Sequence, residues 1–231
     1  MAITPVQRIA KTTIGTSITI GSGDGWVTPG AGDLIVVTFN GDVTASPPAG
    51  YSAGPSVVDD NAGYMFYKVA AGTESTVSLT FGSTAAILTA ASYTGTAAVP
   101  FDASNTSSIV QVHGTTTTST SVTTTAAGDL IVAVATLYDF QTPVGAPTSP
   151  SWTNSFVNTL DSDVNPNTGL HGHTFYGELI AGAAGAYSTS CSWTTQMEER
   201  QQLIAAFKAA AVSAAASPPF RRSRMGALIQ L

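Results

Sequence analysis

The sequence has few charged residues, a single cysteine and no long apolar run. Charged residues make up 10% of its 231 positions, where roughly 25% is usual for a soluble domain. Cys191 has no second cysteine to pair with, so stability cannot depend on an internal disulfide. No segment reaches the roughly 20 consecutive apolar residues that a membrane-spanning helix needs. These absences argue against a disulfide scaffold and against a membrane protein.

Positive charge is especially scarce outside the C-terminus. The net charge is −6, and three arginines, Arg221, Arg222 and Arg224, contribute +3 to it, so the rest of the chain carries −9. A nucleic-acid-binding protein needs a basic face on its folded body, and we therefore expect no nucleic-acid partner. At 43% hydrophobic residues the chain can bury a sizeable core. Abundant Thr, Ser, Ala and Gly in place of charge is typical of a β-rich protein with short polar turns.

Signatures of catalysis are missing too. The sequence contains no Gly-x-Ser-x-Gly nucleophile elbow and no glycine-rich phosphate loop ahead of a helix. Glycoside hydrolysis needs two carboxylates across a cleft, and no pair among the 14 acidic residues stands out. We expect no enzymatic activity.

The chain does contain an internal repeat. Residues 29–37, Pro-Gly-Ala-Gly-Asp-Leu-Ile-Val-Val, return at 125–133 as Thr-Ala-Ala-Gly-Asp-Leu-Ile-Val-Ala, and each copy leads to a Phe-Tyr pair, at Phe66 and at Phe175. Looser matches align Leu88 with Leu203 and Tyr93 with Lys208. Two similar halves, about 17–100 and 115–209, are therefore predicted within a body of residues 1–209.

Apolar and β-branched runs separated by Gly, Asn and Asp clusters predict about ten to twelve strands. One segment conflicts with this pattern, because Met197 to Lys208 is rich in helix formers. Its alignment with the strand ending at Tyr93 favours a strand, with room for a helical turn at 197–200. The predicted strands are 17–20, 34–39, 64–69, 76–81, 87–93, 121–124, 130–137, 174–180, 187–193 and 203–208.

Residues 210–231 form a separate C-terminal arm in this interpretation. An Ala/Ser-rich linker leads to Pro218-Pro219, which keeps the chain extended, and then to a basic and apolar end. We expect this end to bind another subunit, the alternative being a solvated terminus. The predicted interface residues are Arg221, Arg222, Arg224, Leu228, Ile229 and Leu231.

The second half carries about 13 extra residues before its Phe-Tyr pair, and loops added to a scaffold often hold function. Within them, Asp161, Asp163, Asn165 and Asn167 place an oxygen side chain on every second residue, as calcium loops do. Pro166 stands where the turn glycine of an EF-hand belongs. The sequence therefore offers a calcium site at these four residues, with a polar turn as the alternative.

Three histidines are further candidates. His171 and His173, two residues apart on a strand, would present both imidazoles to one face, a spacing usable for zinc or nickel with Asp161 or Asp163 as a third ligand. The alternative is an exposed pair without a ligand. His113 lies in a Ser/Thr-rich linker and is interpreted as solvated, and Cys191 as a small core residue.

Four aromatic residues lie in turn-like segments, where an aromatic ring can either stack on a sugar or cap one of the two halves of the fold. They are Trp26, Tyr51, Tyr138 and Trp152.

The succession Gly-Asp-Leu-Ile-Val, Pro-Pro-x-Gly-Tyr, Phe-Tyr-Lys-Val-Ala-x-Gly and Ala-Ser-Tyr-Thr-Gly resembles β-sandwich proteins of bacteriophage virions, among tail and capsid-decoration proteins. The resemblance covers roughly residues 17–209. It implies an all-β, antiparallel, jelly-roll-like β-sandwich that forms homo-oligomers. We accordingly expect a structural virion subunit, made in the host cytoplasm, whose partners are itself and other virion subunits. The alternative is a carbohydrate-binding or adhesin module that recognises a surface glycan or a receptor.

Overall fold

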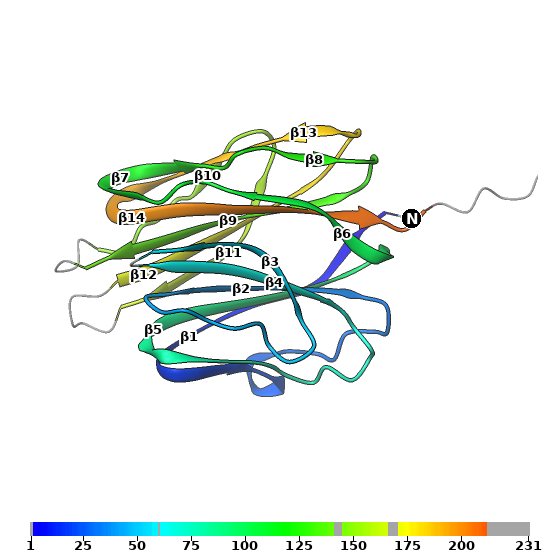
Figure 1. Ribbon diagram of the computed structural model, residues 1–231, viewed down its shortest axis with the longest axis horizontal. Coiled ribbons are helices and arrows are strands. Elements are labelled where there is room, and N and C mark those ends of the chain that lie inside the picture. Colours follow the sequence, from blue (N-terminus) through cyan, green and yellow to red (C-terminus); the bar gives the residue numbers. More distant parts are fainter. Residues whose placement is uncertain (1, 60, 141–144, 166–170, 212–231) are drawn as a thin grey trace, which may run out of the picture.

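The computed structural model describes residues 2–59, 61–140, 145–165 and 171–211 (Figure 1). These residues form fourteen strands and one short 3-10 helix, η1 (Ser22–Asp24), and the strands pair antiparallel. The protein is therefore all-β, as its composition predicts. In the described ranges, no helix is both long enough and apolar enough to cross a membrane.

The first half of the chain forms one five-stranded sheet. Its strand order is β1-β5-β2-β4-β3, so β2 lies at the centre and β1 and β3 at the edges. The strands are β1 (Thr4–Ile20), β2 (Leu34–Gly41), β3 (Ser52–Val58), β4 (Ala62–Val69) and β5 (Val77–Thr94).

The second half forms a second sheet in the order β10-β14-β9-β12-β11, with β6 and β7 also pairing with β14. A separate two-stranded ribbon joins β8 (Val122–Thr124) and β13 (Gly185–Tyr187). The strands of the large sheet are β6 (Thr96–Thr106), β7 (Val110–Thr118), β9 (Leu130–Asp139), β10 (Ser151–Trp152), β11 (Val157–Val164), β12 (His171–Ile180) and β14 (Ser190–Ala209).

The two sheets lie one above the other (Figure 1), and one apolar cluster fills the space between them. Leu34 and Val36 of β2 meet Leu130, Val132 and Val134 of β9 in this cluster. The intervening residues of β9 point the other way and pack under the β8–β13 ribbon, in a cluster that contains Val122. Burial on both faces explains why residues 130–137 read as a continuous apolar run.

The edge strands carry features that interrupt regular pairing. Strand β1 contains Pro5, Arg8 and Lys11, and its register with β5 shifts near Pro5 and near Gly15. Strand β3 contains Pro55 at a register shift against β4. The outer edge of the second sheet is β11.

Two predicted strand pairs are each one long strand. Residues 77–81 and 87–93 belong to β5, and residues 190–193 and 203–208 belong to β14, whereas Tyr187 lies in β13. The helical turn that we allowed at 197–200 is wrong. Residues 199–207 instead pair along β9 from Tyr138 to Leu130, and this ladder overrides the local helix propensity.

Candidate metal centre

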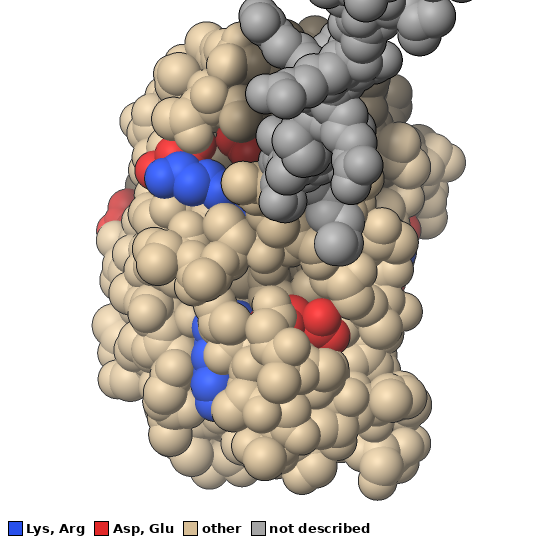
Figure 2. Space-filling view, turned by 90° about the vertical axis from the view of Figure 1, so that its right-hand side faces the viewer, with Lys and Arg blue, Asp and Glu red and all other residues tan. Residues whose placement is uncertain are grey.

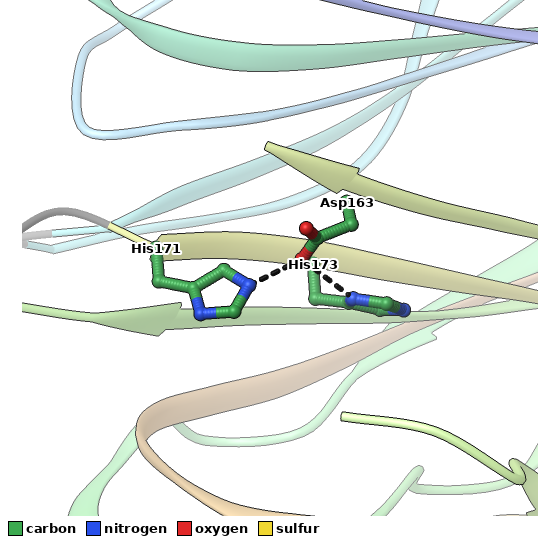
Figure 3. A group of neighbouring side chains, drawn as sticks. All are labelled: Asp163, His171 and His173. Carbon is green, nitrogen blue, oxygen red and sulfur yellow. Dashed lines mark hydrogen bonds and ion pairs between the residues drawn. The ribbon is translucent and has the colours of Figure 1, made fainter. Parts of the chain in front are cut away.

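The β11–β12 hairpin brings acidic and imidazole side chains together (Figure 3). Asp163 on β11 lies directly opposite His173 on β12, and residues opposite each other in an antiparallel pair point to the same face. This is the face turned away from the first sheet, where Phe175 packs against Leu137 and Trp193. From the side of the first sheet, the side-chain amide of Asn40 on β2 donates a hydrogen bond to the backbone carbonyl of His173 at 2.8 Å. This bond helps to hold β12 against the first sheet.

One carboxylate oxygen joins the two histidines. Asp163 Oδ1 contacts His171 Nε2 and lies 3.1 Å from His173 Nδ1 (Figure 3). The other ring nitrogen of His173, Nε2, lies 2.5 Å from Asp161 Oδ1. The imidazoles are buried, with side chains 2% and 3% exposed, whereas the side chains of Asp163 and Asp161 are 35% and 44% exposed. Asp163, His171 and His173 offer three ligand atoms within 4.8 Å of one another.

The local electrostatics favour ionised carboxylates. Burial alone would lower the pKa of His173, but its contacts with Asp161 and Asp163 outweigh burial and raise that pKa above its usual value. For Asp163, burial acts to raise the pKa, and the hydrogen bonds from His173 and His171 lower it overall. A cation in this cluster, whether a proton or a metal ion, is therefore matched by negative charge.

A second group of donors lies beside the first. His113 on β7, Asp139 at the end of β9 and Glu198 on β14 place ligand atoms within 4.8 Å of one another, and His113 Nε2 is 3.7 Å from Asp139 Oδ2. Asp139 is also the register partner of His171. All three histidines of the chain thus gather at the same end of the second sheet, an arrangement that no short sequence motif indicates.

The structure corrects several expectations about these residues. His171 and His173 are not an exposed pair, and His113 lies in strand β7 rather than in a linker. Asp161 and Asp163 belong to strand β11, not to a wrapping loop. Asn165 follows β11, and Asn167 lies outside the described residues, so calcium binding by these four residues stays a prediction. The predicted interface residues Arg221, Arg222, Arg224, Leu228, Ile229 and Leu231 also lie outside them.

The candidate aromatic residues divide into two pairs. Trp26 and Tyr138 are buried, and the Trp26 indole donates to the Glu74 carbonyl at 2.9 Å, so neither can stack on a sugar. Tyr51 and Trp152 are half-buried. Trp152 covers β12 so closely that a side chain at Gly177 would meet its ring at 2.8 Å. Both have structural contacts, which weakens the glycan-binding alternative.

Cys191 is fully buried beside Phe175 and Trp193, which confirms the core interpretation. Burial, together with the charge of Asp161, raises the pKa of its thiol to about 12. The thiol therefore stays protonated at neutral pH and is a poor nucleophile, and it belongs to neither group of candidate metal ligands.

A cavity of about 340 Å³ lies where β1 approaches β12. Its charged side chains are Arg8 and Glu178, which pair with each other at 2.5 Å. Tyr93 also donates to Glu178, at 2.7 Å. Because these polar groups satisfy one another, the metal cluster is the stronger candidate for binding a ligand. Comparisons of the chain with protein-family models, curated proteins and solved structures found no match.

Proposed function

We propose that this protein is a non-enzymatic structural subunit of a bacteriophage particle, either a capsid-decoration protein or a tail component. In this proposal a β-sandwich of two repeats forms the body, and the C-terminal arm joins one subunit to the next. The observation that carries the proposal is that both sheets follow one strand order, which favours a duplicated scaffold; the arm beyond residue 211 lies outside the described residues.

The correspondence between the sheets supports the two repeats. In the first sheet β2 lies between β5 and β4, with β3 beyond β4; in the second, β9 lies between β14 and β12, with β11 beyond β12. Strand β1 flanks β5 as β6 and β7 flank β14. The strands of the first half form one sheet, and those of the second half form the other apart from the β8–β13 ribbon, so we favour a sandwich of two repeats over a jelly-roll arrangement.

The turn before each central strand supports the same conclusion. Gly32 and Gly128 have φ values of +92° and +87°, which glycine adopts without strain. The carboxylate after each glycine accepts from the amide three residues earlier, at 2.8 Å for Asp33 and 3.1 Å for Asp129. The repeated Gly-Asp therefore builds the same turn twice.

Strand register refines the sequence alignment of the two halves. Leu34 pairs with Tyr93, whereas Leu130 pairs with Phe207, so Phe207 rather than Lys208 corresponds to Tyr93. The two Phe-Tyr pairs are offset by two residues: Val36 pairs with Tyr67, but Val132 pairs with Glu178. A two-residue offset keeps each side chain on the same face of its strand, which allows both halves to keep an aromatic residue in the core.

The surface suits dense packing with copies of itself. Figure 2 shows a face with only a few scattered charged groups among uncharged side chains. Sparse charge limits electrostatic repulsion between neighbouring bodies. The three arginines of the arm have the opposite sign to the rest of the chain, which carries −9, and opposite charge favours association of an arm with a neighbouring body.

Deletion of residues 213–231 tests this proposal. The full chain should form oligomers or regular particles visible by light scattering and electron microscopy. The shortened chain should remain folded, with an unchanged circular dichroism spectrum, and stay monomeric because it lacks the apolar end of the arm.

A charge-matched pair of variants separates the arm's apolar end from its length. Leu228→Asp with Ile229→Asp should prevent assembly, whereas Ser213→Asp with Ser217→Asp adds the same charge to the linker and should assemble normally. A full chain that stays monomeric at every concentration, or a deletion that assembles as well as the full chain, would contradict the proposal.

A further inference from the structure

Both ring nitrogens of His173 face a carboxylate oxygen. A neutral imidazole carries one N–H. If His173 Nε2 donates to Asp161, its Nδ1 presents a lone pair to Asp163 Oδ1 at 3.1 Å. Two lone pairs facing each other repel unless a proton or a metal ion lies between them. The same carboxylate oxygen also contacts His171 Nε2, so three possible ligand atoms converge on a small volume.

We propose that Asp163, His171 and His173 bind one transition-metal ion of the zinc class. The ligand atoms are Asp163 Oδ1, His171 Nε2 and His173 Nδ1, and Asp161 positions the His173 ring by accepting from its Nε2. A carboxylate that holds the far nitrogen of a ligating histidine is a recurrent feature of zinc sites, because it fixes the tautomer that exposes the other nitrogen to the metal.

The donor set selects the kind of ion. Two imidazole nitrogens and one carboxylate oxygen suit Zn²⁺, Ni²⁺ or Cu²⁺, whereas Ca²⁺ and Mg²⁺ prefer oxygen ligands alone. The buried thiol of Cys191 does not belong to the group of ligand atoms that lie within 4.8 Å of one another. With three protein ligands, the fourth position is left to water.

The surroundings provide both rigidity and access. The two imidazoles are almost fully buried, and the His173 ring lies 4.4 Å from that of Phe175. The carboxylates of Asp161 and Asp163 are more than a third exposed, which gives an ion a path from solvent. A bound ion would tie edge strand β11 to β12 and so stabilise that end of the sheet.

Titration of chelator-treated full chain with ZnCl₂ tests the proposal. Calorimetry should give one Zn²⁺ per chain, and the melting temperature should rise by at least about 4 °C at saturating Zn²⁺, because the ion binds only the folded state. Equal concentrations of CaCl₂ and MgCl₂ should give no shift. Co²⁺ at the same site should add a visible absorption band that reports nitrogen and oxygen ligation.

Variants assign the ligands. His171→Gln should weaken Zn²⁺ binding by roughly 100-fold or more, and Asp161→Asn by roughly 10- to 100-fold with the Co²⁺ band retained, since all three ligands remain. Asp161→Asn leaves the buried histidines intact, so it keeps the proposal testable if His171→Gln fails to fold. His113→Gln is the matched control and should bind one Zn²⁺ with unchanged affinity.

Several results would overturn the proposal. Absence of Zn²⁺ binding to the wild-type chain would show that a proton bridges these residues in an ion pair. Loss of binding in His113→Gln with retention in His171→Gln would place the ion at the neighbouring group of His113, Asp139 and Glu198. Tighter binding of Ca²⁺ than of Zn²⁺ would support oxygen ligands instead.

Discussion

At the scale of single residues, Glu74 is the clearest example of a carboxylate used for structure. It is buried in the connection between β4 and β5, where it pairs with Lys68 at 2.7 Å. Its oxygens also accept from the backbone amides of residues 71–73, each at 3.1 Å. Burial would raise the pKa of Glu74, but Lys68 and these amides lower it to about 2. The ionised side chain therefore stabilises this loop.

The lowered pKa predicts how Glu74 contributes to stability as pH changes. A carboxylate with a depressed folded-state pKa stabilises the fold above its unfolded pKa of about 4.5 and loses that contribution as pH falls toward 2. Glu74→Gln should therefore lower the free energy of unfolding by about 1 to 2 kcal/mol at pH 7. Urea unfolding of both proteins from pH 7 to pH 3 should show that the difference between their free energies of unfolding, the gap, narrows below a pH of about 4.5. A constant gap would mean that the Glu74 charge is unimportant.

The histidine cluster shows what single residues reveal in a sequence and what they do not. The spacing of His171 and His173 correctly places both rings on one face of a strand. Their burial was not predictable, because it depends on the packing of Phe175, Trp193 and neighbouring residues against that face. The approach of His113 to Asp139 depends on how β7 and β9 flank β14, and such long-range pairing leaves no local signal.

At the scale of elements, strand positions were easier to predict than strand lengths. The apolar run beginning at Leu130 identified β9 because both of its faces are buried. Strand β14 was harder, since its segment 197–202 contains helix formers whose extended form is stabilised by pairing with β9 and β7. The Ser/Thr-rich connection 101–120 contains part of β6 and all of β7. Neither strand was predicted, because exposed residues with weak alternation give little signal.

A buried polar network joins strands of the two sheets. Glu178 on β12 receives hydrogen bonds from Arg8 on β1, at 2.6 Å and 2.5 Å, and from Tyr93 on β5 at 2.7 Å. The hydroxyls of Tyr93 and Tyr176 lie 2.9 Å apart. Burial, with the nearby charge of Glu178, raises the pKa of both tyrosines, which stay protonated. The network fixes how β12 sits on the first sheet.

Removing one partner of the Arg8–Glu178 ion pair should lower the free energy of unfolding more than removing both partners. Glu178→Ala leaves Arg8 partly buried without its carboxylate, and we expect a loss of about 3 kcal/mol in the free energy of unfolding. The double variant Arg8→Met, Glu178→Leu leaves no unpaired charge and should recover most of that loss. Chemical denaturation of the three proteins measures this, and equal losses in the single and double variants would count against it.

At the scale of the whole molecule, the two sheets share the apolar cluster between them, and the first sheet also has a buried cluster of its own. The cluster between them takes Leu34, Met65 and Tyr93 from the first half, and Leu203 and Phe207 from the second. Neither sheet can bury this face alone. The halves that resemble two units in sequence therefore depend on each other for stability.

This dependence predicts that half of the chain does not fold by itself. A fragment of residues 1–100 exposes its share of the common core and should show no cooperative thermal transition. The matched control, residues 1–211, keeps both halves without the arm and should melt in a single transition. A fragment 1–100 that melts cooperatively, with the near-ultraviolet circular dichroism of ordered aromatic residues, would show instead that the repeats are independent domains.

The edge strands have a consequence for protein made in many copies at high concentration. An unpaired strand edge is a template on which another chain can add a strand, and such addition leads to aggregation. Here β1 carries Pro5, Arg8 and Lys11, and β3 carries Pro55 at a break in its register. The edge strand β11 presents two exposed carboxylates. Proline and charge at these edges oppose the addition of strands from other copies, and so oppose the growth of amyloid-like fibres.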